Sequence, residues 1–219
     1  MPKYSSDDPY IDAASGVLKN LLGITNGAAL EAAEADFVAE RSRELSRKPL
    51  EGRFDLEHLQ AIHRYLFQDV YAWAGELRTI DIGKGGHLFA HHAHIQSAAA
   101  PIFKRLAQEK HLAGLDPAAF SERAAHYLGE ANALHPFREG NGRAQRQFIS
   151  HLARANGYSI AWRNVNPDDM LKSSIASFKG DTSQLAAILR ANLSPIDAVA
   201  IRSKKKPARG PRENGPNQP

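Results

Sequence analysis

A stripe of apolar residues that stops just before a proline constrains the fold of this chain more than any other feature. Asp116 is an expected N-cap and Pro117 suits a first helical position. Behind them, apolar residues recur at helical intervals at Phe120, Ala124, Tyr127, Ala131 and Leu134. Pro136 prevents the helix from simply continuing, and the glycines at 140 and 142 permit a tight turn before a second helix, expected over 142–156. The sequence therefore predicts two helices joined by a short glycine-rich loop.

The spacing of apolar residues elsewhere is mostly helical as well. Asp55 and Asn166 are expected N-caps, and the further helices are predicted over residues 27–47, 56–70, 94–112, 167–178 and 182–193. Pro101 predicts either a kink in the segment 94–112 or a later start of that helix. One segment differs: alternation at 77–82, a glycine-rich turn at 83–86 and a return at 87–90 predict a small β-hairpin. We expect a mostly α-helical bundle with this hairpin packed against it.

Composition excludes several classes of protein. The chain of 219 residues has no cysteine, which rules out disulfides, thiolate zinc sites and cysteine nucleophiles. It contains neither an N-terminal apolar h-region nor a long apolar run, so we expect no secretory cleavage and no membrane span.

The positive charge of the chain lies in its C-terminal tail. Residues 202–219 hold six Lys and Arg against one Glu, so the rest of the chain has a slight negative balance within the net charge of +4. We divide the chain into one domain, residues 1–201, and a basic tail, residues 202–219, that is too poor in apolar side chains to fold. We expect nucleic acid to bind, if anywhere, to the tail.

The loop between the two central helices carries residues suited to phosphate chemistry. A helix N-terminus presents unpaired N–H groups, and glycines let an anion approach the backbone closely. Arg143 and Arg146 lie three residues apart and can both lean toward the first helical turn. Glu139 can hold a Mg²⁺ ion that phosphate also ligates, and His135 can take a proton from a hydroxyl near neutral pH. Each residue alone is more often structural or solvated, but together they indicate nucleotidyl or phosphoryl transfer.

At this point the sequence resembles a known family. Residues 135–146, His-Pro-Phe-Arg-Glu-Gly-Asn-Gly-Arg-Ala-Gln-Arg, match the Fic motif at every specified position. Residues 73–78 and 89–91 are similar to the segment around the flap hairpin of that family. Residues 8–10 and 18–24 resemble the N-terminal region of bacterial Fic toxins, so the likeness covers roughly residues 7–195.

The resemblance implies a helical Fic fold that transfers AMP from ATP to a Ser, Thr or Tyr hydroxyl of a target protein. It makes His135 the base, Phe137 the anchor of the loop in the core, and Glu139 the ligand of Mg²⁺. It gives phosphate binding to the backbone of Gly140, Asn141 and Gly142, to the Asn141 side chain, and to Arg143 and Arg146. The predicted hairpin becomes a flap beside the active-site loop that docks the target by strand addition. The flap residues expected to do so are Thr79, Ile80, Asp81, Ile82, Gly83, Lys84, Phe89 and His91.

The resemblance also implies a regulator. Some Fic proteins carry an inhibitory helix with the pattern Ser/Thr-x-x-x-Glu-Gly/Asn, and no such pattern occurs here. We therefore expect the toxin of a toxin–antitoxin pair, restrained by a small separate antitoxin whose Glu reaches Arg146. A type II topoisomerase subunit is one candidate target. The bacterial cytoplasm is the expected location, with secretion into another cell as the alternative.

Three alternative interpretations stay open. A Doc-like kinase is the nearest, although Gly142 stands where that branch has Lys. A non-catalytic interaction module with a basic binding or secretion tail is the second, and deletion of 203–219 would separate tail function from enzyme function. The third concerns the histidines at 87, 91, 92 and 94, which we interpret as a polar hairpin rather than a metal site, because no suitably spaced carboxylate or cysteine joins them.

Overall fold

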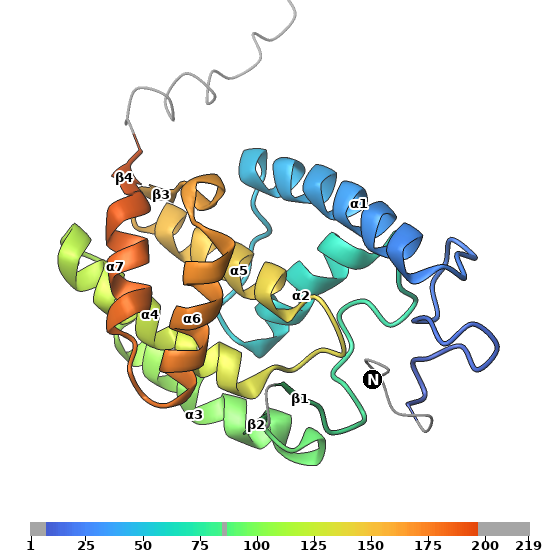
Figure 1. Ribbon diagram of the computed structural model, residues 1–219. Coiled ribbons are helices and arrows are strands. Elements are labelled where there is room, and N and C mark those ends of the chain that lie inside the picture. Colours follow the sequence, from blue (N-terminus) through green and yellow to red (C-terminus); the bar gives the residue numbers. More distant parts are fainter. Residues whose placement is uncertain (1–7, 85–86, 197–219) are drawn as a thin grey trace, which may run out of the picture.

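The computed structural model describes residues 8–84 and 87–196, which form a bundle of helices with two very small sheets (Figure 1). The helices among these residues are α1 (Gly27–Arg47), α2 (Leu56–Phe67), α3 (Ile95–Gln108), α4 (Pro117–Leu134), α5 (Asn141–Ala155), α6 (Pro167–Phe178) and α7 (Ser183–Asn192). The strands are β1 (Gly83–Lys84), β2 (His87–Leu88), β3 (Tyr158–Ile160) and β4 (Leu193–Pro195). Short 3₁₀ turns lie at His92–His94, Lys110–Leu112 and Trp162–Asn164.

Side-chain caps fix where four of the helices begin. Asn26, Asp55, Asp116 and Asn166 each accept hydrogen bonds from backbone N–H groups in the first turn of α1, α2, α4 and α6. The prediction is confirmed for the helices at 27–47 and 117–134 at both ends. Both ends are fixed by the sequence because a cap stands at the start and the apolar stripe stops at the end.

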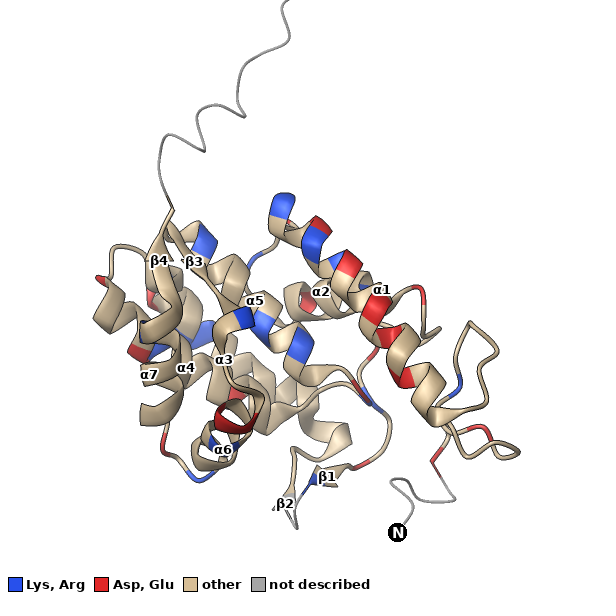
Figure 2. Cartoon of the chain, turned by 45° about the horizontal axis from the view of Figure 1, so that its top comes forward, with Lys and Arg blue, Asp and Glu red and all other residues tan. Residues whose placement is uncertain are grey.

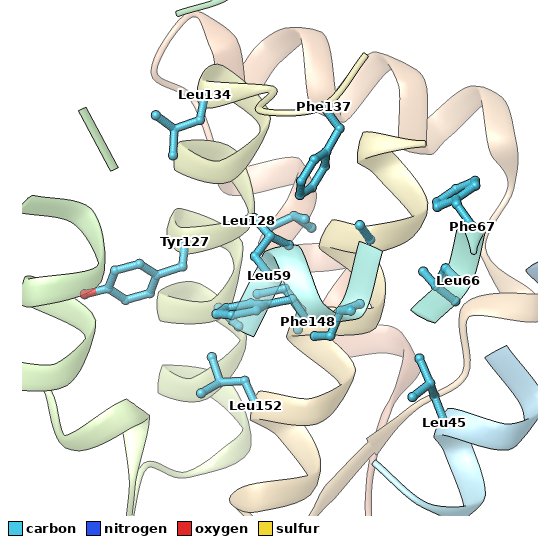
Figure 3. Packing of buried hydrophobic residues seen from close by; sticks show 14 of the residues in the cluster. Leu45, Leu59, Leu66, Phe67, Tyr127, Leu128, Leu134, Phe137, Phe148 and Leu152 are labelled. Carbon is cyan, nitrogen blue, oxygen red and sulfur yellow. The ribbon is translucent and has the colours of Figure 1, made fainter. Parts of the chain in front are cut away.

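The core lies where α2, α4 and α5 meet, and Figure 3 shows their side chains interdigitating. Helix α5 packs against α2 on one side and α4 on the other, α3, α6 and α7 pack against α4, and α1 covers α2. The side chains at the centre are fully or almost fully buried, among them Leu59, Leu66, Phe67, Leu128, Phe137, Phe148 and Leu152. The two helices that flank the glycine-rich loop are thus held in the centre of the bundle.

Three helix predictions are wrong in detail. The segment 94–112 divides into α3, which runs through Pro101, and a 3₁₀ turn at Lys110–Leu112. Helix α2 ends at Phe67, although Val70 beyond it is still buried. Leu193 belongs to β4, which pairs antiparallel with β3 in a sheet that the sequence did not predict. Strands of three residues are too short for their alternation to stand out in sequence.

The hairpin exists but lies later in the chain than predicted. Its strands are Gly83–Lys84, which we expected in the turn, and His87–Leu88. Residues 77–82 form no strand because their polar groups bond elsewhere: the Arg78 N–H, for example, donates to the Pro136 carbonyl at 2.9 Å. Only the N–H of Phe89, bonded to the Ile82 carbonyl at 3.2 Å, extends the pairing toward the predicted first strand.

Two predictions concern residues that the structure does not describe. The turn residues Gly85 and Gly86 and the tail at 202–219 lie outside the described ranges. Within those ranges, no helix combines the length and the apolar character that crossing a bilayer requires.

Candidate active site

Buried contacts lock the loop that joins α4 to α5. The Phe137 side chain is fully buried and stacks on the His63 ring of α2 with centroids 3.9 Å apart. The Phe137 N–H donates to Asn141 Oδ1 at 2.9 Å, and Asn141 Nδ2 donates back to the Phe137 carbonyl at 2.7 Å. We expected the Asn141 side chain at the phosphates; instead its amide, 3% exposed, closes the loop on itself. The loop is therefore shaped before any ligand arrives.

His63 ties the same loop to two other segments. Its Nδ1 accepts the Gly75 N–H at 2.8 Å, so the ring proton lies on Nε2 and is donated to the Glu139 carbonyl at 2.9 Å. Burial lowers the pKa of His63 to about 3, which keeps the ring neutral. This histidine thus fixes the backbone of Glu139 without adding charge to the site.

An ion pair holds the middle of the loop from the N-terminal side. Arg138 donates through Nε and Nη2 to Asp8 Oδ2, at 2.8 and 2.5 Å, and both side chains are almost completely buried. Nearby, Tyr10 bonds to Thr79 through its hydroxyl. The segment before α1 therefore contributes to the site although it lies far from it in sequence.

The N-terminus of α5 is left open for a ligand. Gly140 is its N-cap with φ +79°, and no side chain caps the helix there, in contrast to α1, α2, α4 and α6. A Cβ at Gly140 would overlap the Phe67 ring, so both the backbone angle and the packing require glycine. At Gly142, by contrast, a Cβ would meet only Arg146 Nη1, at 3.4 Å. The fold requires Gly140, whereas Gly142 keeps the space beside Arg146 empty.

His135 lies directly after the last residue of α4. Its backbone has φ +42° and ψ +61°, in the left-handed region that ends a helix. Its Nδ1 lies 3.2 Å from the Asn132 carbonyl, which can only accept, so Nδ1 carries the proton and Nε2 has a free lone pair. Burial lowers the pKa of His135 to about 4, although the Glu139 carboxylate acts against this. The ring is therefore neutral at physiological pH and can accept a proton.

The two arginines of the motif, Arg143 and Arg146 in α5, have different partners. Arg143 Nη2 lies 2.5 Å from Glu34 Oε1 of α1, and its guanidinium lies over the Phe67 ring. Tyr71 donates to the other oxygen of Glu34 and holds that carboxylate in place. The prediction that both arginines lean toward the first turn of α5 to bind phosphate stays a prediction for Arg143, whose guanidinium pairs here with a buried carboxylate on α1.

Arg146 has neither an ion pair nor a side-chain hydrogen bond to any residue in 8–84 or 87–196. Burial and the charge of Arg143 lower the pKa of its guanidinium. Arg146 lines two clefts that meet at the loop, together with Glu139 and Gly142. The cleft beside α1 has a volume of about 1070 Å³, and the cleft beside α6, which holds His135 and Lys84, about 600 Å³. Figure 2 shows acidic segments along α1 and basic segments along α5.

Glu139 lies at the junction of the two clefts. Its carboxylate accepts the Gly140 N–H at 3.0 Å and lies 3.8 Å from Arg143 Nη2. It is about one third exposed, so it can reach a cation that enters from either cleft. A partly exposed carboxylate beside a phosphate-sized space is the kind of ligand that Mg²⁺ takes from proteins.

The flap connects to His135 through Arg78 and Phe89. The Phe89 ring stacks on the His135 ring at 3.7 Å with an interplanar angle of 11°. The buried Arg78 guanidinium donates to the carbonyls of His135, Ile80, Leu134 and Ala90. Of the other predicted flap residues, Gly83 and Lys84 form β1, while Thr79, Asp81, Ile82 and His91 lie in the segments leading to and from the hairpin.

Sequence reasoning missed four residues that shape this site: Asp8, Glu34, His63 and Arg78. Two of them left a signal. Glu34 stands between Leu30 and Val38 on the buried stripe of α1, and His63 stands beside Ile62 and Leu66 on that of α2. A polar side chain on a buried stripe needs a partner, so each position indicated a buried polar contact.

Comparisons with known proteins agree with this geometry. The sequence profile of the Fic/DOC family matches residues 53–153. The chain is 50% identical over 195 residues to the protein adenylyltransferase VbhT of Bartonella schoenbuchensis, covering 89% of this chain but only 41% of VbhT. It is 38% identical to a probable protein adenylyltransferase Fic of Salmonella typhimurium, covering 85% of this chain and 92% of that one. The chain belongs to the Fic/DOC family.

Solved structures show the same fold with nucleotide bound. The BepC protein of Bartonella tribocorum, with bound AMPPNP, has a TM-score of 0.80 at 26% identity and covers 85% of this chain and 96% of its own. The N-terminal Fic domain of a VirB-translocated effector of Bartonella quintana, with bound ADP, has a TM-score of 0.82 at 28% identity, with 88% and 97% covered. The predicted Fic fold with a small hairpin is therefore confirmed.

Proposed function

We propose that this chain is a protein adenylyltransferase that moves AMP from ATP to a hydroxyl group of a target protein. Relatives that it matches over most of their length carry that name, and two of its structural neighbours hold adenine nucleotides. The observation that carries the proposal is the position of Arg146: a cation without an ion pair in the described chain lines the same cleft as the neutral base His135.

The proton is handled by His135. The Nε2 lone pair of the neutral ring takes the proton of the target hydroxyl, while Nδ1–H stays bonded to the Asn132 carbonyl. The hydroxyl oxygen forms a bond to the α-phosphorus of ATP, and the bond from that phosphorus to the bridging oxygen of pyrophosphate breaks. The leaving pyrophosphate carries away the bonding electron pair, so charge builds up on the β- and γ-phosphates.

The negative charge that builds up on the pyrophosphate would be stabilised by the N-terminus of α5 and its two arginines. The backbone of Gly140, Asn141 and Gly142 lies beside the ligand at the N-terminus of α5, where the N–H groups of Asn141 and Gly142 face it and the Gly140 N–H is bonded to the Glu139 carboxylate. Arg143 contacts the β-phosphate, held in orientation by Glu34, and Arg146 contacts the γ-phosphate. Because these groups are already in place, they stabilise the transition state without having to rearrange.

Glu139 is the residue that would hold Mg²⁺. A single carboxylate at the junction of both clefts fits this ion, which completes its shell with phosphate oxygens and water. Bound there, Mg²⁺ would neutralise phosphate charge during transfer.

We further propose that a small antitoxin restrains the enzyme by presenting a Glu to Arg146. The cleft of about 1070 Å³ lies between α1 and Arg146, and it leaves room for a carboxylate from a partner to reach that guanidinium. The target docks on the flap, and a type II topoisomerase subunit remains our candidate for it. The bacterial cytoplasm is the proposed place of action, with delivery into another cell as the alternative.

The test uses ATP labelled at the α- or the γ-phosphate, incubated with the purified chain and bacterial lysate. We expect label on a protein from the α position only, and no label when His135→Ala replaces the wild type. Label from the γ position only would identify a kinase and overturn the proposal. Adding the separately purified antitoxin should abolish the α-label; continued labelling at saturating antitoxin would contradict the regulatory part alone.

A further inference from the structure

Both sides of the flap hairpin bring potential metal ligands to one place. Asp81 precedes β1, and His91 and His92 follow β2. One ligand atom of each of these three residues lies within 4.8 Å of the others, and no other such trio of His, Asp or Glu occurs within residues 8–84 and 87–196. The sequence argument against a metal site, that no carboxylate joins the histidines, is therefore wrong. The carboxylate comes from the opposite side of the hairpin, ten residues before His91.

We propose that Asp81, His91 and His92 form a binding site for a divalent transition metal ion such as Zn²⁺. His92 Nδ1 lies 3.0 Å from Asp81 Oδ1, and His91 Nε2 lies 3.3 Å from Asp81 Oδ2. Ligands at 2.0–2.1 Å around a tetrahedral ion are separated by about 3.3 Å, close to both distances. Two imidazoles with one carboxylate favour a transition metal over Mg²⁺ or Ca²⁺, which prefer oxygen ligands.

The carboxylate of this site is held in place by a backbone contact. The His92 backbone N–H donates to Asp81 Oδ1 at 2.8 Å and fixes the position of that oxygen. Arg78 Nη1 lies 3.7 Å from the same oxygen, but its guanidinium is directed mainly at backbone carbonyls.

The histidines must turn to bind the ion, because their rings now stack with centroids 4.6 Å apart and an interplanar angle of 28°. His91 Nδ1 now accepts the Ala93 N–H at 3.3 Å, so its ring proton lies on Nε2, toward Asp81. Metal binding would move that proton to Nδ1 and give up this long contact. The three side chains are 36–53% exposed, which leaves open positions for water or for a side chain of the target.

A metal here would act on the flap rather than on the phosphates. It would join the two ends of a hairpin whose strands have two residues each, and such a hairpin is marginal on its own. One side chain, Arg78, separates the site from the backbone of His135. The ion would therefore hold the docking segment in register with the base.

The experiment titrates the full-length chain with Co²⁺, followed by its visible absorption, and with Zn²⁺ in competition with a chromophoric chelator. No ATP, Mg²⁺ or target is present, so the outcome does not depend on the proposed AMP transfer. We expect one equivalent to bind to the wild type. Each of Asp81→Asn, His91→Ala and His92→Ala should weaken binding by about tenfold or more.

His126→Ala is the matched control because it removes an imidazole from α4 outside the trio and should bind like the wild type. Absence of saturable binding by the wild type would overturn the proposal, as would equal affinity in Asp81→Asn and the wild type. Without saturable binding, the contacts between Asp81 and the two histidines would be ion pairs and no metal site. Circular dichroism checks the fold of each variant, and Asp81→Asn decides alone if a histidine variant does not fold.

Discussion

The active-site loop and the flap lie side by side but are held in opposite ways. The loop at 135–142 is fixed by buried contacts to Phe137, Asn141, Arg138 and His63. The flap has two-residue strands, and residues in and beside them, such as Lys84 and Asp81, are exposed. It is tied to the bundle by the buried Arg78 side chain, by the Phe89 ring stacked on His135 and by the Ala90 N–H bonded to the Ala133 carbonyl. The groups proposed to carry out the chemistry are thus placed in advance, whereas the segment proposed to meet the target has fewer buried contacts.

This difference fits what each segment is proposed to bind. Phosphates have one geometry, so a rigid loop stabilises the transition state with groups that need not move. A target segment that adds as a strand supplies its own backbone hydrogen bonds, so the flap needs exposed edges rather than a filled core. If this comparison is right, substitutions in the loop should change the rate of AMP transfer or the stability of the fold. Substitutions in the flap should change mainly the KM for the target.

The largest effect is expected for His135→Ala. Removing the base should lower the rate of AMP transfer by about 10²–10⁴-fold, because no other group takes the hydroxyl proton. ATP affinity should change little, since the proposed phosphate contacts come from the loop backbone and arginines. Labelling from α-labelled ATP measures the first, and calorimetric titration with ATP the second. His126→Ala, on the same helix, is the control and should transfer normally.

The pH profile sharpens the role of His135. Because burial lowers its pKa to about 4, the neutral base form is present at pH 6–8, so its titration should not limit the rate in that range. Protonation, and with it loss of activity, begins only as the pH falls toward 4. A rate that halves near pH 6.5, with the protein still folded by circular dichroism, would contradict this assignment.

Substitutions at Gly140 and Gly142 should have different effects: we expect the first to lower stability and the second to weaken ATP binding. Gly140→Ala should lower the free energy of unfolding by about 2–6 kcal/mol, because it adds strain at φ +79° and overlaps Phe67. Gly142→Ala should leave stability unchanged or raise it by up to about 1 kcal/mol. It should still weaken ATP binding, roughly tenfold, by placing a methyl group beside Arg146.

Urea unfolding of both variants measures the change in stability, and titration with ATP measures the change in affinity. Phe67→Leu combined with Gly140→Ala is the matching double variant, and part of the lost stability should return because the smaller side chain relieves the overlap. Equal destabilisation by the two alanines would mean that the fold, not the ligand, requires both glycines.

The same contrast explains how far the sequence could predict this protein. The helices around the loop were predictable because caps and apolar stripes are local signals, and residues 135–146 are contiguous. The contacts that hold the loop were not, because Asp8 pairs with Arg138 across 130 positions and Glu34 reaches Arg143 from another helix. No local pattern encodes such pairings.

The flap shows a second limit of sequence reasoning. Ile80 and Ile82 alternate as strand residues do, yet the Ile80 carbonyl is bonded to the Arg78 side chain instead of to a neighbouring strand. The strands that form are shorter and lie later in the chain. The Asp81 carboxylate meets the histidines only because the hairpin folds back on itself. Tertiary contacts overrode local alternation there.

Arg78→Lys tests the tie between the two regions. Lysine cannot reproduce the fork that serves the carbonyls of His135, Ile80, Leu134 and Ala90, so stability should fall by about 1–3 kcal/mol. The KM for the target should rise more than the ATP affinity falls. Urea unfolding and steady-state labelling measure these effects. If the KM for the target and the dissociation constant for ATP rose by the same factor, Arg78 would support the loop as much as the flap.

Acid should destabilise the bundle through its buried histidines. The pKa of His63 is lowered to about 3 and that of His151 to about 4, both mainly by burial, against about 6.5 in an unfolded chain. Below pH 6.5 the unfolded chain therefore binds more protons than the folded one. The free energy of unfolding should fall with decreasing pH, by up to about 1.4 kcal/mol per pH unit for each histidine. His151→Gln should reduce this slope in urea unfolding between pH 7 and 5; an unchanged slope would contradict the assignment.

The smallest effect is expected on the flap itself, for Lys84→Ala. Lys84 is exposed in β1 but lines the same cleft as His135, so it can touch the target without holding the fold. Stability should change by less than about 0.5 kcal/mol. The KM for the target should rise only a few-fold, roughly the effect of one screened surface charge, and kcat should stay within about twofold. Steady-state labelling at several salt concentrations measures this, because the difference should shrink as salt screens the charge. A loss as large as that of His135→Ala would place Lys84 in the chemistry and remove the distinction between a fixed loop and an adaptable flap.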